Sequence, residues 1–220
     1  MREIWTAKPE TRIALSRMDP ASTHGLAGGR AAAEAALAND HAELARWQDR
    51  LWAEAKRALL VVLQGMDASG KDGTIKHVFQ GVNPQATRVV AFKVPTPEEL
   101  AHDFLWRVHQ AVPRFGEIGI FNRSHYEDVL ASRVRKLVPE RVWKARFPEI
   151  VDFEAMLVRS GTTVVKIFLH ISRDEQKRRF EERLQQPDKR WKFRRGDLDD
   201  RALWAEYQTA YEDALSRTST

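Results

Sequence analysis

A glycine-rich segment between an apolar run and a helical stretch is the feature that most constrains this chain. The segment reads GMDASGKDG (residues 65–73) and matches the first seven positions of the pattern G-x-x-x-x-G-K-[ST]. Glycines let the backbone curl so that several N–H groups face one anion, and the following helix adds partial positive charge. Lys71 supplies a full charge to phosphate oxygens. We therefore expect a phosphate-binding loop that includes Gly65, Met66, Ala68, Ser69, Gly70, Asp72 and Gly73.

Two acidic residues distinguish this loop from the usual pattern. Asp72 stands where Ser or Thr ordinarily ligates magnesium, so the metal must be held differently. Asp67 lies among amides that bind phosphate, which makes sense if it binds Mg²⁺, directly or through water, or orients the attacking phosphate. We predict that Asp67 and Lys71 are catalytic and that Asp67 is a metal ligand.

The surrounding chain alternates between strand-like and helix-like stretches. Short runs rich in β-branched residues predict four strands at residues 58–64, 88–94, 117–122 and 162–172. This alternation predicts an α/β fold, a three-layer α/β/α sandwich with a parallel central sheet. Ligands in such folds bind beyond the carboxyl ends of the strands.

Helical spacing fills the intervals between these strands. We expect one domain over residues 1–220, with a helical extension over 1–57 that contains a long helix from about residue 30 to 56. Leu37, Leu44, Trp47, Leu51 and Trp52 are expected to pack in that helix, and Phe180 and Leu184 to form a buried pair. Further helices are expected up to about residue 82, over 97–112, from 126, over 149–159 and from 174.

A second group of polar residues closes the third predicted strand. It reads FNRSHYED (residues 121–128), with Asn122 at the strand end and Glu127 and Asp128 one turn later. Arg123 can reach a transferring phosphoryl group and offset its charge. His125 is interpreted as a turn or packing residue. We expect Arg123 and Asp128 to take part in catalysis.

Positive charge is concentrated in one segment. Residues 177–195 hold nine Lys or Arg against three acidic residues, whereas the whole chain has a net charge of +5. Such a local patch indicates an anionic ligand. We interpret residues 174–196 as a helical lid that closes cations over a phosphorylated substrate. The interleaved Trp191 and Phe193 also suit nucleic-acid binding, which is the competing interpretation.

Several classes of protein are excluded by what the sequence lacks. There is no cysteine, so disulfides, thiolate catalysis and cysteine-ligated metals are ruled out. The longest apolar run, Ala58 to Leu63, is far too short to span a bilayer, and the first residues contain no secretory signal. We expect a soluble cytoplasmic protein that binds neither membranes nor nucleic acids.

Taken together, four stretches resemble the family 2 polyphosphate kinases. They are GMDASGKDGTIKHV (65–78), FKVPTPEELAHDFLWRVH (92–109), GEIGIFNRSHYEDVL (116–130) and FLHISRDEQKRRFEERLQQPDKRWKF (168–193). The resemblance covers nearly all of the chain from about residue 30. It implies reversible, Mg²⁺-assisted transfer of a terminal phosphoryl group between inorganic polyphosphate and a nucleotide, with Mn²⁺ as a substitute metal. It also implies a P-loop fold related to nucleoside monophosphate kinases.

The resemblance assigns roles to individual residues. The loop acid and lysine of the family fall on Asp67 and Lys71. The family's F-D-R-S motif has a metal-binding acid where this chain has Asn122, so Asp128 or Glu127 is a candidate for the missing carboxylate. The sequence leaves open whether Asn122 or Asp128 contacts the metal. The cations implied to hold phosphates are Lys76, Arg133, Arg179, Arg183, Lys189, Arg190 and Lys192, of which Arg183 is expected to be catalytic.

The resemblance also implies substrates and assembly. The stretch Tyr126-Glu127-Asp128 looks similar to the subgroup that phosphorylates both nucleoside mono- and diphosphates, which suggests AMP and ADP as acceptors and extends to GMP and GDP. Family members commonly form dimers or tetramers, so a homo-oligomer is expected. They also commonly continue beyond the position of Thr220 with a short Pro-Trp-containing stretch and a final helix, so either the natural protein is shorter or a C-terminal tail is missing from this chain.

Two other functions are compatible with parts of the pattern. An ATP-dependent nucleoside monophosphate kinase shares the loop, the lid and the fold, but more usually carries Ser or Thr in place of Asp72. A nucleic-acid or polyphosphate binding module without turnover explains the basic segment but leaves Asp67 without a role. The choice of phosphate donor separates these interpretations.

Overall fold

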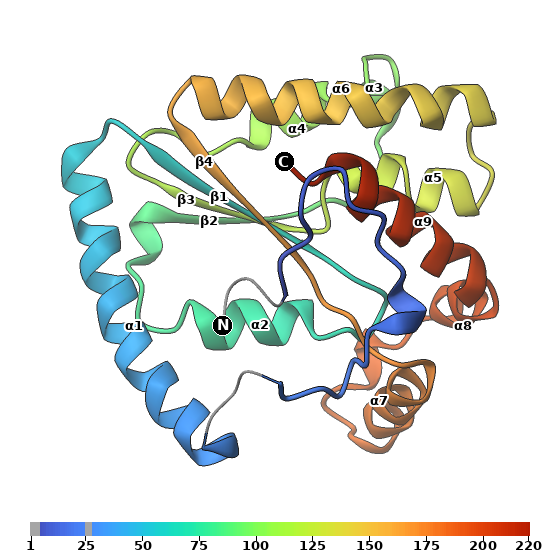
Figure 1. The fold of residues 1–220 in the computed structure, drawn as a ribbon, viewed down its shortest axis with the longest axis horizontal. Coiled ribbons are helices and arrows are strands. Elements are labelled where there is room, and N and C mark those ends of the chain that lie inside the picture. The colour runs from blue at the N-terminus through green and yellow to red at the C-terminus, as the bar shows by residue number, and fades with distance from the viewer. Residues whose placement is uncertain (1–4, 25–27) are drawn as a thin grey trace.

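The fold is a four-stranded parallel sheet between two layers of helices (Figure 1). The computed structural model describes residues 5–24 and 28–220, and the strand order is β2-β3-β1-β4. The strands are β1 (Ala58–Gln64), β2 (Thr87–Ala91), β3 (Ile118–Asn122) and β4 (Thr162–Phe168). The helices are α1 (Gly29–Glu54), α2 (Lys71–Val78), α3 (Pro97–Leu100), α4 (Trp106–Ala111), α5 (Ala131–Val134), α6 (Glu140–Arg159), α7 (Arg173–Gln185), α8 (Arg195–Ala202) and α9 (Trp204–Thr218).

Residues on the two faces of the sheet belong to separate apolar clusters. Leu60 and Val62 of β1 face the larger cluster, which includes buried residues of α6 and α9. Val61 and Leu63 face the smaller cluster, to which α1 and α2 contribute. Alternate side chains of this buried strand therefore pack against the helices on opposite faces of the sheet. The predicted three-layer sandwich with a parallel sheet is confirmed.

Strand register brings the carboxyl ends of the strands to one edge. Asn122 at the end of β3 is aligned with Leu63 of β1 on one side and with Ala91 of β2 on the other. Gln64 at the end of β1 is aligned with Phe168 at the end of β4. The segments that follow these residues are therefore neighbours in space, which is where an α/β fold binds its ligand.

Three predicted helices have different bounds in the structure. The expected helix over 97–112 is divided into α3 and α4, because Asp103 Oδ1 accepts from Leu105 N and starts a new turn. From residue 125 a short 3₁₀ helix, η4 (His125–Asp128), precedes α5 in place of one α-helix. Helix α6 begins nine residues earlier than expected and runs through Pro148, because its apolar face packs into the core along its length.

Some expected packing contacts are also wrong. Trp47 and Trp52 of α1 are 56% and 45% exposed, and Gln48 is instead the buried residue of that helix. Phe180 is buried against Phe193, whereas Leu184, its expected partner, is 45% exposed. Side chains on one face of a helix can differ in burial, because the neighbouring helices and strands determine which part of that face they cover.

The N-terminal segment is helical only in part. Residues Leu15–Arg17 form a short 3₁₀ helix, η2, and the first α-helix within residues 5–24 and 28–220 is α1, so the expected helical extension begins there. Ile13 N donates to Ser216 Oγ at 2.8 Å and Leu15 N donates to Glu212 Oε1 at 2.7 Å, which ties this segment to α9. Parts of the predicted extension, residues 1–4 and 25–27, lie outside the described residues.

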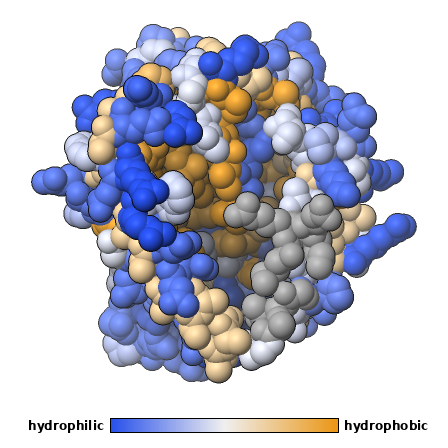
Figure 2. Space-filling model, turned by 60° about the vertical axis from the view of Figure 1, so that its left-hand side comes forward, coloured by the Kyte–Doolittle hydropathy of each residue, from blue (hydrophilic) through white to orange (hydrophobic). Residues whose placement is uncertain are grey.

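The molecular surface is mostly hydrophilic on the side of α1. Figure 2 shows this side, where an apolar hollow is open between hydrophilic side chains. The edge strand β4 leaves Val165 and Ile167 40% and 38% exposed. Within residues 5–24 and 28–220, no helix is both long and apolar enough to cross a membrane.

Close packing around β3 predicts a large effect of one methyl group. A Cβ at Gly119 would lie 2.8 Å from Cδ of Pro113, a rigid ring that cannot turn away. We expect Gly119→Ala to lower the free energy of unfolding by about 1–3 kcal/mol, measured by urea denaturation. The control is Gly73→Ala in α2, where no atom lies within 4 Å of the added Cβ and where alanine favours the helix. Equal stability of both variants would contradict the prediction.

Candidate active site

The glycine-rich loop joins the end of β1 to the start of α2. Gly65 has a φ of 152°, and a Cβ at this position would lie 2.8 Å from the carbonyl oxygen of Leu169. Gly70, just before α2, has a φ of 104°. Both positions require glycine because an L side chain is strained there or would overlap the neighbouring backbone. The predicted strand–loop–helix context is present, with the loop at the ligand-binding edge of the sheet.

Lys71 is folded back into this loop. Its Nζ donates to the carbonyl oxygens of Gly65 at 2.6 Å and Met66 at 3.0 Å, and lies 3.5 Å from Ser69 Oγ. Burial, and after it the positive charge of Arg123, lower the pKa of Lys71 to about 8. The direct hydrogen-bond partners of this ammonium group are therefore neutral oxygens of the loop.

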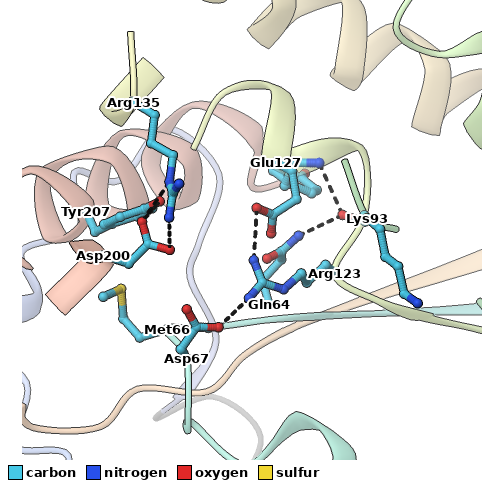
Figure 3. Close-up of polar contacts among 12 residues, drawn as sticks. Gln64, Met66, Asp67, Lys93, Arg123, Glu127, Arg135, Asp200 and Tyr207 are labelled. Atoms are coloured by element: carbon cyan, nitrogen blue, oxygen red, sulfur yellow. Dashed lines mark hydrogen bonds and ion pairs between the residues drawn. The ribbon is translucent and has the colours of Figure 1, made fainter. Parts of the chain in front are cut away.

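Arg123 joins the second polar group to the loop (Figure 3). Its guanidinium donates to Asp67 Oδ1 through Nη2, and Nη1 lies 3.5 Å from Glu127 Oε2. The negative charge of Glu127, which has the larger effect, and that of Asp67 raise the pKa of Arg123 above its usual value, so the guanidinium stays charged. Burial raises the pKa of Glu127. The structure thus brings Asp67, Lys71, Arg123 and Glu127 together at one place.

The predicted lid contributes direct contacts to the loop from α7. Arg179 Nη1 donates to the carbonyl oxygen of Ala68 at 2.9 Å, and its Nε donates to Glu175 at 2.6 Å. Gln176, which is fully buried, donates to the carbonyl oxygen of Asp67 at 2.9 Å. The first half of the lid segment is therefore packed on the loop. Arg183, one turn further along α7, lies over the ring of Phe180.

Asp72 contacts both the second polar group and the lid. Asn122 Nδ2 donates to Asp72 Oδ1 at 2.7 Å, and Lys192 Nζ of the lid lies 3.7 Å from Asp72 Oδ2. The residue that replaces Ser or Thr is thus paired with an amide and an ammonium group. The strand-end residue Asn122 contacts this carboxylate and so holds the beginning of α2 against β3.

Other predicted site residues have partners elsewhere. Asp128 accepts from Arg146 Nη1 at 3.0 Å and lies 3.8 Å from Arg107, so the structure places it among arginines of α4 and α6 and not in the loop. Arg133 donates to Asp213 of α9 at 2.6 Å. Lys76, Lys189 and Arg190 are exposed, and Arg190 donates to the carbonyl oxygen of Leu184. No group of three or more His, Asp or Glu side chains among the described residues is arranged to hold a metal ion.

The structure adds residues that the sequence did not single out. Asp197, in the first turn of α8, has its pKa raised by burial and then by the negative charge of Asp67. Gln64 has its amide between Ser124 and Glu127 and, with its nitrogen toward Glu127, donates to Oε1 at 3.2 Å. The acidic run after residue 195 was a visible signal for Asp197, but nothing in the sequence indicated that the charge of Asp67 acts on it.

A second charged cluster borders the same site. Asp200 of α8 accepts from Arg135 Nε at 2.9 Å and from the Tyr207 hydroxyl at 2.8 Å (Figure 3). Burial and the neighbouring Asp200 raise the pKa of Tyr207, so its hydroxyl stays protonated as a donor. This cluster fixes α8 and α9 relative to α5. The lid segment is thereby attached at its C-terminal end as well.

These side chains suit the transfer of a phosphoryl group. Three cations, Lys71, Arg123 and Arg179, contact a glycine-rich loop of the kind whose backbone N–H groups suit an anion. Such transfer requires positioning and charge neutralisation, and no nucleophile from the protein. The arrangement can therefore act on phosphate chains without covalent attachment to the protein.

Comparison with known proteins identifies the family. The model of the polyphosphate kinase 2 (PPK2) family matches residues 29–220. The chain belongs to this family. The matched region contains the glycine-rich loop, the second polar group and the lid, so the motifs that define the site also define the family resemblance.

Individual relatives agree with this assignment. An AMP/ADP-polyphosphate phosphotransferase of Meiothermus ruber is 57% identical over 216 residues, which are 98% of this chain and 81% of that protein. An ADP-polyphosphate phosphotransferase of Rhodopseudomonas palustris is 45% identical over 79% of this chain and 64% of that protein. The crystal structure of polyphosphate kinase 2 from Arthrobacter aurescens TC1 has a TM-score of 0.92 at 44% identity, over 98% of this chain and 80% of that one.

The burial of Lys71 predicts how anion binding by this PPK2 protein depends on pH. Below its pKa of about 8 the ammonium group is charged and can bind phosphate, and above that pH it must first take up a proton. We expect the Kd for inorganic tripolyphosphate, measured by calorimetry, to rise about tenfold between about pH 7 and about pH 9. The variant Lys71→Met corrects for titration of the ligand itself. The same pH dependence in both proteins would contradict the assignment.

Proposed function

We propose that this protein transfers the terminal phosphoryl group of inorganic polyphosphate to AMP and ADP, reversibly. The observation that carries the proposal is the contact of Asp67 with Arg123 beside Lys71, at the ligand-binding edge of a PPK2-family chain. The glycine-rich loop binds the phosphates next to the scissile bond. The protein supplies charge and alignment, and the acceptor phosphate attacks in line.

Each basic residue has a distinct part in the proposed reaction. Lys71 leaves the loop carbonyls and binds phosphate oxygens, which restores its pKa toward the usual value. Arg123 binds the transferring phosphoryl group, because its guanidinium already lies between two carboxylates beside the loop. Arg179 and Arg183 of α7, with Lys189, Arg190 and Lys192, extend the positive charge along the lid to hold the polyphosphate chain.

The proposed acceptors follow from the second polar group and from relatives. The relative from Meiothermus ruber is named for both AMP and ADP, and this chain carries Tyr126-Glu127-Asp128 in the second motif. Glu127 lies against Arg123 and therefore beside the transferring group. Guanine nucleotides are included in the proposal as further acceptors, as the family resemblance implies.

The side chains around the loop fit a bound Mg²⁺. This ion is usually held by one or two carboxylates and by phosphate oxygens of the substrate. Asp67 lies in the loop, and its negative charge helps to raise the pKa of Asp197, so we propose Asp67 as the first carboxylate for this ion and Asp197 as the second. When bound, Mg²⁺ supplies neutralisation of phosphate charge, and Mn²⁺ can substitute. Asp128, paired with Arg146 and Arg107, is not part of this proposed set.

The activity is tested by supplying donor and acceptor separately. Purified protein with Mg²⁺ and long-chain polyphosphate is expected to form ATP from ADP, and ADP and ATP from AMP, followed by chromatography. ATP formed from ADP alone would remove AMP from the proposal. Phosphorylation of AMP by ATP but not by polyphosphate would instead identify an ATP-dependent monophosphate kinase. Binding of polyphosphate without turnover would identify a binding module.

Two carboxylate variants test the proposed metal ligand. Asp67→Asn is expected to lower kcat at least about hundredfold and to weaken the dependence on Mg²⁺, because it removes the loop carboxylate. Asp128→Asn serves as the matched control. It removes a buried partner of Arg146 and is expected to lower the melting temperature while the Mg²⁺ concentration for half-maximal activity stays unchanged. The reverse pattern would assign the metal to Asp128.

The assembly of the protein is a separate part of the proposal. We expect a dimer or tetramer in solution, as the family resemblance implies. Sedimentation or light scattering of the purified protein measures the mass directly, and the monomer mass of 25.3 kDa is the reference.

A further inference from the structure

A buried polar cluster lies beneath the loop that carries Arg123. Its members come from four elements that are distant in sequence: His125 and Tyr126 of η4, Glu154 of α6, Lys166 of β4 and Thr218 of α9. His125 is fully buried, and Glu154, Thr218 and Tyr126 are only 3%, 3% and 5% exposed. We call these five residues the buried network. None of them belongs to the phosphate-binding loop or to the lid.

Glu154 is the centre of the buried network. Its Oε1 accepts from the Tyr126 hydroxyl at 2.9 Å and from His125 Nε2 at 3.2 Å, and its Oε2 accepts from Lys166 Nζ at 2.6 Å. Burial opposes the ionised form, but the hydrogen bond from His125 and the charge of Lys166 outweigh it, so the pKa of Glu154 is held below its usual value. The carboxylate is therefore charged and uses both oxygens.

The buried network also reaches the last turn of α9. The Tyr126 hydroxyl lies 2.9 Å from Thr218 Oγ1, and Lys166 Nζ donates to the Thr218 carbonyl oxygen. The side chain of Tyr126 is thus fixed at its far end by two different elements. Its ring is packed in the core and contacts the ring of His125.

The segment over residues 123–127 has one face toward the core and one face toward the phosphate-binding loop. Ser124, His125 and Tyr126 are buried, whereas Arg123 contacts both Asp67 and Glu127. Residues of a 3₁₀ helix are spaced three to a turn, so fixing His125 and Tyr126 also fixes the direction of Glu127. Arg123 has a φ of 63°, a conformation that persists only where the surroundings enforce it.

Stability alone does not account for such a network. A buried charged cluster is often no more stabilising than apolar residues of the same volume, and its better-attested effect is to select one arrangement. Here the arrangement selected is that of the loop that presents Arg123 to the phosphate. We propose that Tyr126 and Glu154 are positioning residues for phosphoryl transfer, which hold Arg123 and Glu127 in place from inside the core. This inference rests on the proposed function.

The test compares two hydroxyl deletions. Tyr126→Phe keeps the ring but removes the contacts to Glu154 and Thr218. The control, Thr87→Val, removes a hydroxyl that bonds Gln48 and Asn83 at the start of β2, at the opposite edge of the sheet. We expect similar small losses of melting temperature, but a fall of about tenfold in kcat only for Tyr126→Phe, with an unchanged KM for polyphosphate. Glu154→Gln should behave like Tyr126→Phe.

A double-mutant cycle asks whether the effect passes through Arg123. In an Arg123→Lys background the additional loss of kcat from Tyr126→Phe should nearly disappear, because the group being positioned is already gone. An undiminished loss in that background, or a kcat equal to that of the original protein in Tyr126→Phe, would overturn the inference. A loss of the same size in Thr87→Val would also overturn it, because the effect would then follow stability.

A spectroscopic measurement separates this inference from the proposed function. The Arg123 Nε–H signal in a ¹H–¹⁵N spectrum, identified by its absence in Arg123→Lys, should shift and broaden in Tyr126→Phe and stay unchanged in Thr87→Val. If the original protein shows no polyphosphate-dependent turnover, the proposed function fails, and this signal still decides whether the buried network positions Arg123. An Arg123 signal that is the same in the original protein, in Tyr126→Phe and in Thr87→Val would overturn the inference.

Discussion

The parallel register between β1 and β3 determines the geometry of the site. It aligns Leu63 with Asn122, so the segments that begin at Gln64 and at Arg123 leave the sheet side by side. The Arg123 backbone N–H even donates to the Leu63 carbonyl oxygen, continuing the ladder by one bond before the chain turns away. Because adjacent strands are only about 5 Å apart, a guanidinium on one segment reaches a carboxylate on the other. The Asp67–Arg123 contact is the result.

Charge in the site is balanced by the protein's own groups. Lys71 uses loop carbonyls as partners, Arg123 uses Asp67 and Glu127, and Asp72 uses Asn122 and Lys192. In the proposed function, a bound phosphate chain replaces these neutral carbonyl partners with charged oxygens, which strengthens the interactions of Lys71. The lid is part of the same balance because Arg179 already contacts the loop through Ala68. Binding therefore changes the partners of cations that are preassembled.

Adjacent residues of the second polar group have opposite roles because of a tight turn. Glu127 faces Arg123, whereas Asp128 faces Arg107 and Arg146 on the core side. The sequence presented them as an acidic pair and left open which of them contacts a metal. A 3₁₀ turn over residues 125–128 rotates each side chain by about a third of a circle, which sends the two carboxylates to different layers. Spacing along the sequence alone could not separate them, since an α-helix was the expected structure.

The amino-acid sequence alone indicated where the four strands lie along the chain, where the glycine-rich loop lies, and which residues are the cations of the site. Backbone freedom, β-branching and charge are properties of a few neighbouring residues, so they can be identified without the fold. Gly65, Lys71 and Arg123 were identifiable for that reason. Contacts between distant segments decided the rest: Asp128 and Arg133 have partners on other helices, and Glu154 accepts a hydrogen bond from Tyr126 beneath the segment that carries Arg123. Such pairings depend on how helices pack across the sheet, and packing is set by the whole apolar core, so only the tertiary structure could decide them.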